Sequence, residues 1–216
     1  MIEGIDVSQF QGPIDWQKVA ADGKAFAICR ATIGLGTDPT FLTNCRGARA
    51  AGLLVGAYHA YETSRDPIEQ AKHFGAVAAG CIDIFPALDF EGGCAGIPAA
   101  QALRMARTFC ETGDTIFVKT MGVYSFPFFW NGLVWKATAD DAAWCRDRPF
   151  WLALYPGKDN PDPLAPFSSV DLHQYSAKGV VPGIHGPVDL DRYYGTLDEL
   201  RLVGVYEPTD TLAPVS

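Results

Sequence analysis

The sequence predicts an α/β protein, an irregular and abbreviated (β/α) barrel with about eight mostly parallel strands and fewer helices than a full TIM barrel. Two observations predict this fold: apolar, strand-like segments recur along the whole chain, and helix-like segments separate several of them. Such alternation favours parallel strands joined by crossover connections. A complete barrel with eight helices takes roughly 250 residues. The chain has 216, so we expect the shortened form.

The expected strands are apolar segments that end in polar residues. They cover residues 3–8, 25–32, 53–61, 85–91, 116–125, 150–155, 170–176 and 188–191. Helical composition or period is found at 14–22, 40–51, 67–79, 97–112 and 139–147. Some connections, such as the proline-rich stretch 155–169, are expected to be loops without a helix.

The composition fits one domain with a sizeable core, because 48% of the residues are hydrophobic. The 22 glycines and 15 prolines suit many short strands joined by turns better than a helical bundle. The net charge of −8 gives no basic face for nucleic acid, whose binding depends on clustered Lys and Arg. It also works against simple attraction to anionic cell walls, so a polymer substrate needs specific contacts.

We expect a catalytic domain at residues 1–206 and an exposed or extended C-terminal tail at 207–216. No segment approaches the roughly 20 uninterrupted apolar residues of a transmembrane helix, so no membrane insertion is expected. The N-terminus lacks the cationic and apolar segments of a signal peptide. This leaves two settings, synthesis in the cytosol or a secreted protein in its mature form.

The six cysteines contain no C-x-x-C pair, and only scattered histidines lie near them in the sequence. This pattern argues against a zinc site. No metal and no cofactor are expected. Ordinary buried thiols and one to three disulfides both remain open.

Polar residues fall repeatedly at the ends of the expected strands. They are Asp6; Arg30 and Thr32; Tyr58 and His59; Asp89 and Glu91; Tyr124; Tyr155; Gln174 and Tyr175; and Asp189. In a parallel barrel these strand ends converge on one face, where barrel enzymes place their active sites. The pattern therefore predicts a polar site on that face.

The most informative segment is Pro86-Ala87-Leu88-Asp89-Phe90-Glu91-Gly92-Gly93. Residues i and i+2 of a strand share a face, so Asp89 and Glu91 point the same way. Neighbouring carboxylates disfavour each other's ionisation, which keeps one as a proton donor while the other stays ionised. Hydrolysis of a glycosidic bond requires such a proton donor. The alternative is a pair of solvated carboxylates that cap the next helix.

Further fragments extend this pattern over nearly the whole chain. They are Gly4-Ile5-Asp6-Val7-Ser8, Gln11-Gly12, Ile14-Asp15-Trp16, Arg30-Ala31-Thr32, Asp38, Phe41, Asn44, Ala51-Gly52-Leu53, Gly56-Ala57-Tyr58-His59, Val123-Tyr124-Ser125, Trp151-Leu152-Ala153-Leu154-Tyr155, Gln174-Tyr175-Ser176 and Val188-Asp189-Leu190-Asp191-Arg192-Tyr193. In this order and spacing the chain resembles the glycoside hydrolase family 25 lysozymes, the Chalaropsis-type muramidases of phage, bacteria and fungi.

The resemblance implies hydrolysis of the β-1,4 bond between N-acetylmuramic acid and N-acetylglucosamine in bacterial peptidoglycan. It assigns Glu91 as the general acid and Asp89 as the carboxylate that positions the 2-acetamido group. Asp6 and Asp189 match two further aspartates of the cleft. The family is regarded as retaining, through attack by the substrate's own acetamido oxygen. Direct attack by Asp6 or Asp189 remains the alternative.

Six further side chains are candidates for binding the glycan: Tyr58, Tyr124, Tyr155, Gln174, Tyr175 and Arg30. The tyrosines offer apolar rings with polar tips. Arg30 either pairs with cleft carboxylates or forms a structural ion pair. Trp151 is expected in the core, and His59 is expected to be structural.

Two positions depart from the family pattern. Ile33 stands where many relatives carry a polar or acidic residue, and Asp191 stands where Asn is common. The second change adds negative charge near Asp189.

Two rival functions remain. One is a chitinase-like N-acetylglucosaminidase, because chitin also carries 2-acetamido groups. The other is a silent module that binds peptidoglycan without cutting it. For a muramidase, the expected setting is a monomeric phage endolysin, made in the host cytoplasm and released to the wall at lysis. A secreted enzyme in its mature form is the alternative.

Overall fold

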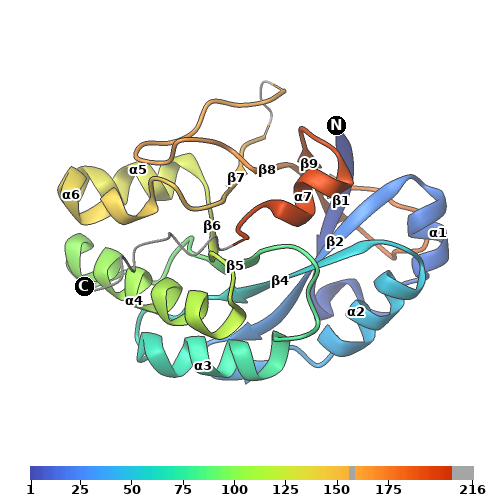
Figure 1. The fold of residues 1–216 in the computed structure, drawn as a ribbon, viewed down its shortest axis with the longest axis horizontal. Helices are drawn as coiled ribbons and strands as arrows, with labels where there is room; N and C mark the ends of the chain where they lie inside the picture. The colour runs from blue at the N-terminus through green and yellow to red at the C-terminus, as the bar shows by residue number, and fades with distance from the viewer. Residues whose placement is uncertain (156–158, 206–216) are drawn as a thin grey trace, which may run out of the picture.

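The computed structural model describes residues 1–155 and 159–205 (Figure 1). Its centre is a closed barrel of eight strands. These are β1 (Ile2–Val7), β2 (Lys24–Ile33), β4 (Leu54–Ala60), β5 (Pro86–Asp89), β6 (Gly122–Ser125), β7 (Phe150–Ala153), β8 (Leu172–Gly179) and β9 (Val188–Tyr193). The short β3 (Gly36–Thr37) pairs antiparallel with the end of β2, outside the closed ring.

The strands follow the order β1-β9-β8-β7-β6-β5-β4-β2, and the pairing of β1 with β2 closes the barrel. All neighbours from β1 through β2 and β4 to β8 are parallel. Only β9 runs antiparallel to both of its neighbours. The prediction of an irregular, mostly parallel barrel is thus confirmed.

The direction of β9 changes how Asp189 reaches the catalytic face. The sequence pattern treats Asp189 as the end of a parallel strand, but it lies at the second position of the antiparallel β9. Because β9 is reversed, its beginning lies where the parallel strands end. Asp189 is paired with Asp6 in the β1–β9 register.

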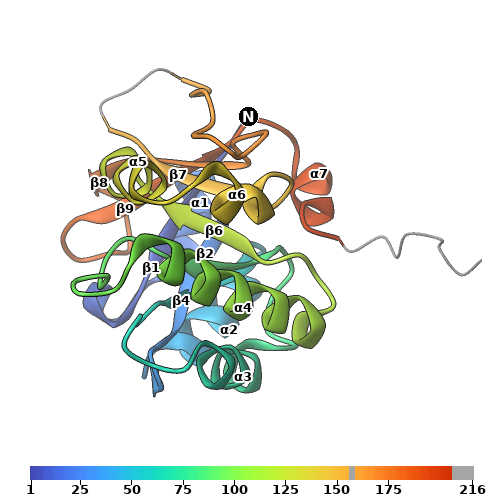
Figure 2. The ribbon, with the colours of Figure 1, turned by 90° about the vertical axis from the view of Figure 1, so that its left-hand side faces the viewer.

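Seven helices surround the strands in the described part of the chain. They are α1 (Trp16–Ala21), α2 (Phe41–Ala50), α3 (Pro67–Ala78), α4 (Ala99–Phe117), α5 (Pro127–Lys136), α6 (Ala139–Ala142) and α7 (Leu197–Leu202), with 3-10 turns η1 (Gln9–Gln11) and η2 (Ala143–Cys145). Figure 2 shows α2, α3 and α4 along one side of the barrel and α5 and α6 on another.

The sequence prediction differs from the structure in three places. Residues 116–121 are not strand, because α4 continues to Phe117 and ends at Val118 in the left-handed conformation (φ 51°). Helix α5 was not predicted, because its sequence is apolar on every side and shows no helical period. The short α7 was also missed. The predicted tail at 207–216, together with residue 206, lies outside the described residues.

Strand alternation divides the core into two layers. Inward side chains such as Phe26, Ile28 and Trp151 fill the barrel, while Ala27 and Cys29 pack outward against the helices. The six cysteines are free thiols, so the disulfide alternative is wrong. None of the described helices has the length and apolar character needed to span a membrane.

Candidate active site

A pocket of about 250 Å³ lies where the parallel strands end. Its lining residues are Asp6, Tyr58, Asp89, Glu91, Tyr124, Trp151, Tyr155, Gln174 and Asp189. The structure therefore brings together all four predicted catalytic carboxylates and four of the six predicted glycan-binding residues. Trp151, expected in the core, is buried but also contributes to the pocket floor.

Residues 89–91 are fixed by the neighbouring strand β6. Asp89 ends β5 and faces the pocket, whereas Phe90 is buried in the outer core layer. The Phe90 amide donates to the Tyr124 carbonyl at 3.0 Å, and the Ser125 hydroxyl donates to the Phe90 carbonyl at 2.9 Å. Glu91 follows directly, so its side chain returns to the pocket side although it lies beyond the strand.

Gln174 links three lining residues on the opposite side. Its Nε2 donates to Oδ2 of Asp6 at 2.7 Å. Its Oε1 accepts from the hydroxyls of Tyr124 and Tyr155 at 3.0 and 3.3 Å. These bonds fix the orientation of the Gln174 amide and hold Asp6 in place.

Asp191, which was not predicted as a site residue, lies behind Asp6. It is fully buried, and its Oδ1 accepts from Nε1 of Trp151 at 2.8 Å. Its Oδ2 has no donor among the described residues unless a proton is shared with Asp6, the carboxyl group it contacts. Asp191 lies two residues after Asp189, so strand alternation places both on the same face of β9. This spacing is the sequence feature that could have identified Asp191 as a site residue.

The buried carboxyl groups have strongly shifted acidities. Burial raises the pKa of Asp6 well above its usual value, and negative charge at Asp191 and Asp189 adds to this. Burial also raises the pKa of Asp89, where the charge of Glu91 adds and that of Arg30 opposes. Burial raises the pKa of Asp191 to about 8.

Glu91 lies at the mouth of the pocket and is open to solvent. Even so, the surrounding protein raises its pKa, and the charge of Asp189 raises it further. Burial raises the pKa of Asp189 as well. With the pKa of Asp191 at about 8, these neighbouring carboxyl groups are not all ionised at neutral pH. The site therefore retains protons, and Glu91 is the carboxyl best placed to pass one to a ligand.

Three aromatic side chains that line the pocket pack against one another. The rings of Tyr58 and Tyr124 pack edge-on against Trp151, with centroid distances of 6.0 and 4.7 Å. Burial raises the pKa of both phenols, so they remain hydrogen-bond donors at any physiological pH.

Tyr175 and Arg30 do not line the pocket. Because side chains alternate along β8, Gln174 faces inward and Tyr175 faces away, where its hydroxyl donates to Glu3 (3.2 Å). The prediction that Tyr175 binds glycan in the pocket thus finds no support in its position. Arg30 forms an ion pair with Asp38, Nε to Oδ2 at 2.9 Å.

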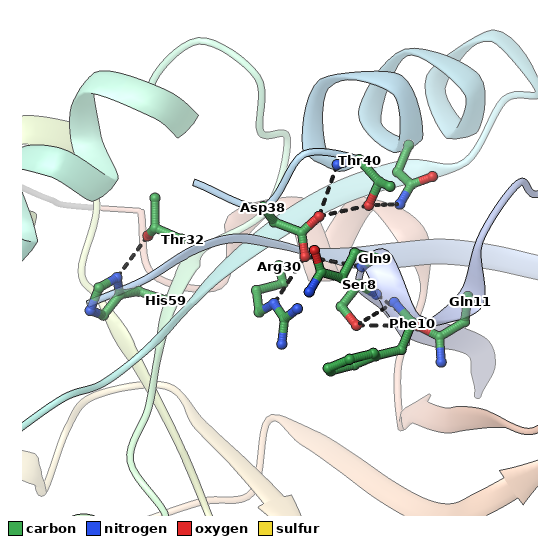
Figure 3. Close-up of polar contacts among 10 residues, drawn as sticks. Ser8, Gln9, Phe10, Gln11, Arg30, Thr32, Asp38, Thr40 and His59 are labelled. Carbon is green, nitrogen blue, oxygen red and sulfur yellow. Dashed lines mark hydrogen bonds and ion pairs between the residues drawn. The ribbon is translucent and has the colours of Figure 1, made fainter. Parts of the chain in front are cut away.

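His59 is buried and does not line the pocket. Its ring nitrogens form hydrogen bonds with the Thr32 hydroxyl at 2.7 Å, which Figure 3 shows, and with Oε1 of Gln70 at 3.1 Å. Burial lowers the pKa of His59 to about 4. Its neutral ring therefore has the structural role expected from the sequence.

Residues 5–184 match the model of a sequence family described as "Glycosyl hydrolases family 25". The chain belongs to this family. Among family 25 relatives, lysozyme M1 of Streptomyces globisporus is 29% identical over 92% of this chain and 70% of its own length.

Solved structures of lysozymes have the same fold as this chain. A bacterial lysozyme from Streptomyces coelicolor is 28% identical, with a TM-score of 0.81 over 94% of this chain and 97% of that one. A family 25 lysozyme from Aspergillus fumigatus is 25% identical, with a TM-score of 0.79 over 94% and 98%. The family 25 chain described here is thus a glycoside hydrolase.

Proposed function

We propose that the chain is a muramidase that hydrolyses the β-1,4 bond between N-acetylmuramic acid and N-acetylglucosamine in bacterial peptidoglycan, with residues 1–206 as its catalytic domain. The observation that carries the proposal is the pocket in which Glu91 and Asp89 meet Asp6 and Asp189. Family membership and relatives named as lysozymes support the substrate.

Glu91 acts as the general acid. The surrounding protein and the charge of Asp189 raise its pKa, which favours the form that carries the proton, and its position at the pocket mouth lets it reach a glycosidic oxygen. The proton passes to that oxygen as the bond to the anomeric carbon breaks. Glu91, now ionised, then accepts a proton from the water that completes hydrolysis.

Asp89 positions the 2-acetamido group by accepting a hydrogen bond from its N–H. Side chains at i and i+2 of one strand lie on the same side of the sugar, so Asp89 is badly placed to attack opposite Glu91. The acetamido oxygen instead attacks the anomeric carbon and forms a cyclic intermediate. Water opens this intermediate, and the configuration is retained, a known exception to the use of an enzyme nucleophile.

Direct attack by Asp6 or Asp189 is the competing scheme. The two schemes differ in their response to glycan whose acetamido groups have been removed. Substrate assistance requires the acetamido oxygen, so such glycan should not be cleaved. Continued cleavage, with a glycosyl adduct on Asp6 or Asp189 detected by mass spectrometry, would establish the enzyme nucleophile instead.

The function is tested by digesting purified peptidoglycan with the wild-type protein and with Glu91→Gln. For the wild-type digest, mass spectrometry should find fragments with N-acetylmuramic acid at their new reducing ends. The digest with the variant should contain no such fragments. Ends in N-acetylglucosamine would mean cleavage of the other bond. If several wall types resist, chitin oligomers test the chitinase-like reading, and binding without turnover would indicate a silent module. The monomeric state and the endolysin setting stay predictions.

A further inference from the structure

Phe10 is an aromatic side chain that the catalytic scheme leaves unused. It lies in η1, which follows β1 and its pocket residue Asp6 closely in the chain. The residue is 77% exposed, although large apolar side chains normally gain free energy by burial. Its position near the rim of the catalytic face calls for an explanation.

The exposure of Phe10 does not come from a loose loop. The Ser8 amide donates to Oε1 of Gln11 at 2.9 Å, and the Phe10 amide donates to the Ser8 hydroxyl at 3.3 Å. The Gln9 amide donates to the carboxylate of Asp38 at 3.0 Å. Figure 3 shows this network, which holds the backbone of the turn that carries Phe10.

Arg30 packs against the same ring. Its guanidinium carbon lies 5.0 Å from the centroid of Phe10, within the range of a cation–π contact. Its Nε donates to Asp38, whose side chain is fully buried and also accepts from the amide and hydroxyl of Thr40. Arg30 is therefore fixed by a buried anchor rather than by a surface ion pair.

The terminal nitrogens of Arg30 have no hydrogen-bond partner among the described residues, and in Figure 3 they point away from Asp38. Arg30 faces inward on β2 and is paired in register with Tyr58 of the pocket. Burial raises the pKa values of Asp89 and Tyr58, and the charge of Arg30 opposes that rise. Arg30 thus connects the pocket to the ring of Phe10.

We propose that Phe10 and the terminal nitrogens of Arg30 form a subsite that binds an additional N-acetylated sugar unit of the glycan, beside the catalytic pocket. The proposal rests on the proposed function. A pocket of about 250 Å³ is smaller than typical ligand pockets, which measure roughly 300–1,000 Å³, so a polymer must extend beyond it.

The chemistry of the two side chains fits a sugar ring. The exposed face of Phe10 packs against the C–H face of a pyranose, and the free guanidinium N–H groups donate to a hydroxyl or acetamido oxygen. Because Asp38 already anchors Arg30 and the turn that carries Phe10 is held by hydrogen bonds, binding costs less conformational entropy than on a loose loop. In a chain with a net charge of −8, such directed contacts are needed to hold a wall polymer.

The test compares Phe10→Ala, Phe10→Trp and the control Phe128→Ala. Phe128, on α5, is 89% exposed and lies outside the pocket lining. We expect Phe10→Ala to lower kcat/KM on long, peptide-free glycan strands about two- to tenfold. Its activity on a short oligosaccharide that fills only the pocket should be unchanged. Phe10→Trp should retain activity on long strands, and Phe128→Ala should match wild type on both substrates.

Three results would overturn the proposal. Equal losses on long and short substrates would mean that Phe10 acts through the catalytic pocket. An equal loss in Phe128→Ala would mean that any exposed aromatic has this effect. A loss seen only on strands that carry stem peptides would assign Phe10 to the peptide rather than to sugar.

Binding separates this inference from the proposed function. In the Glu91→Gln background, affinity for peptide-free strands is measured with and without Phe10→Ala. Weaker binding would support the subsite even if the wild-type protein cut no glycan. Unchanged binding would reject the subsite even if the wild-type protein produced fragments with N-acetylmuramic acid at their reducing ends.

Discussion

Two groups of carboxyl residues lie at the pocket or directly behind it, and different parts of the fold place them there. Asp89 and Glu91 are alternate residues at the end of the single strand β5, and Glu91 is open to solvent. Asp6 and Asp191 come from two antiparallel strands, and both are buried. Gln174 holds Asp6 and Trp151 holds Asp191, so neither carboxyl moves freely.

This difference separates a reactive pair from a supporting one. A general acid must exchange its proton with the ligand and later with water, which requires access. Glu91 of the β5 pair has that access. The β1–β9 pair shares buried negative charge and a fixed geometry, which suits it to shaping the field around the ligand. We therefore expect substitutions in the two groups to change different quantities.

Glu91→Gln tests the reactive pair most directly. The amide keeps the shape of the side chain but cannot donate the proton, so kcat should fall about 10²–10⁴-fold. Turnover of purified peptidoglycan measures this effect, and the thermal midpoint and glycan affinity serve as controls. Activity within tenfold of wild type would show that Glu91 is not the acid.

Asp89→Asn should have a smaller effect, about 10- to 100-fold on kcat. The carboxamide retains one oxygen that can accept from the acetamido N–H, but it loses the stabilising charge. Binding of de-N-acetylated glycan, which should not be cleaved, sharpens the test, since Asp89→Asn should change little the affinity for a ligand that lacks the group it positions. Equal losses of affinity for acetylated and de-N-acetylated glycan would contradict the acetamido role.

The β5 pair could be predicted from the sequence because its spacing lies within one strand. The Asp6–Asp191 pair could not, since it depends on the reversed direction of β9, which no local pattern specifies. The same limit explains Tyr175: alternation places Gln174 and Tyr175 on opposite faces, but only the closed barrel decides which face is inside. The apolar α5 was hidden because helical periodicity appears only when one side is polar.

Asp191→Asn tests the supporting pair through stability. The folded-state pKa of Asp191 is raised to about 8, so the folded protein binds this proton more tightly than the unfolded chain does. Its stabilising contribution is complete below the unfolded value near 4 and is lost as pH rises through about 8. The neutral amide keeps an acceptor for Trp151 and adds a donor for Asp6.

The variant should therefore gain stability over wild type as pH rises. The difference between the two free energies of unfolding should grow between pH 4 and pH 8 by at most ~1.4 kcal/mol per pH unit. Thermal unfolding at pH 4, 6 and 8 measures it, at about 2–4 °C per kcal/mol for a domain of this size. A difference that is constant with pH would show that Asp191 is ionised throughout.

Asp189→Asn tests how a charge on β9 affects Glu91 beyond β5, and we expect its effect on activity to be the smallest of the four. The charge of Asp189 raises the pKa of Glu91, and the acid must be protonated to act. The alkaline limb of kcat/KM therefore falls as pH rises through the pKa of Glu91. Removing the charge lowers that pKa, so the limb should move to lower pH. A limb that stays in place while kcat collapses would instead give Asp189 a direct chemical role, as the nucleophile scheme requires.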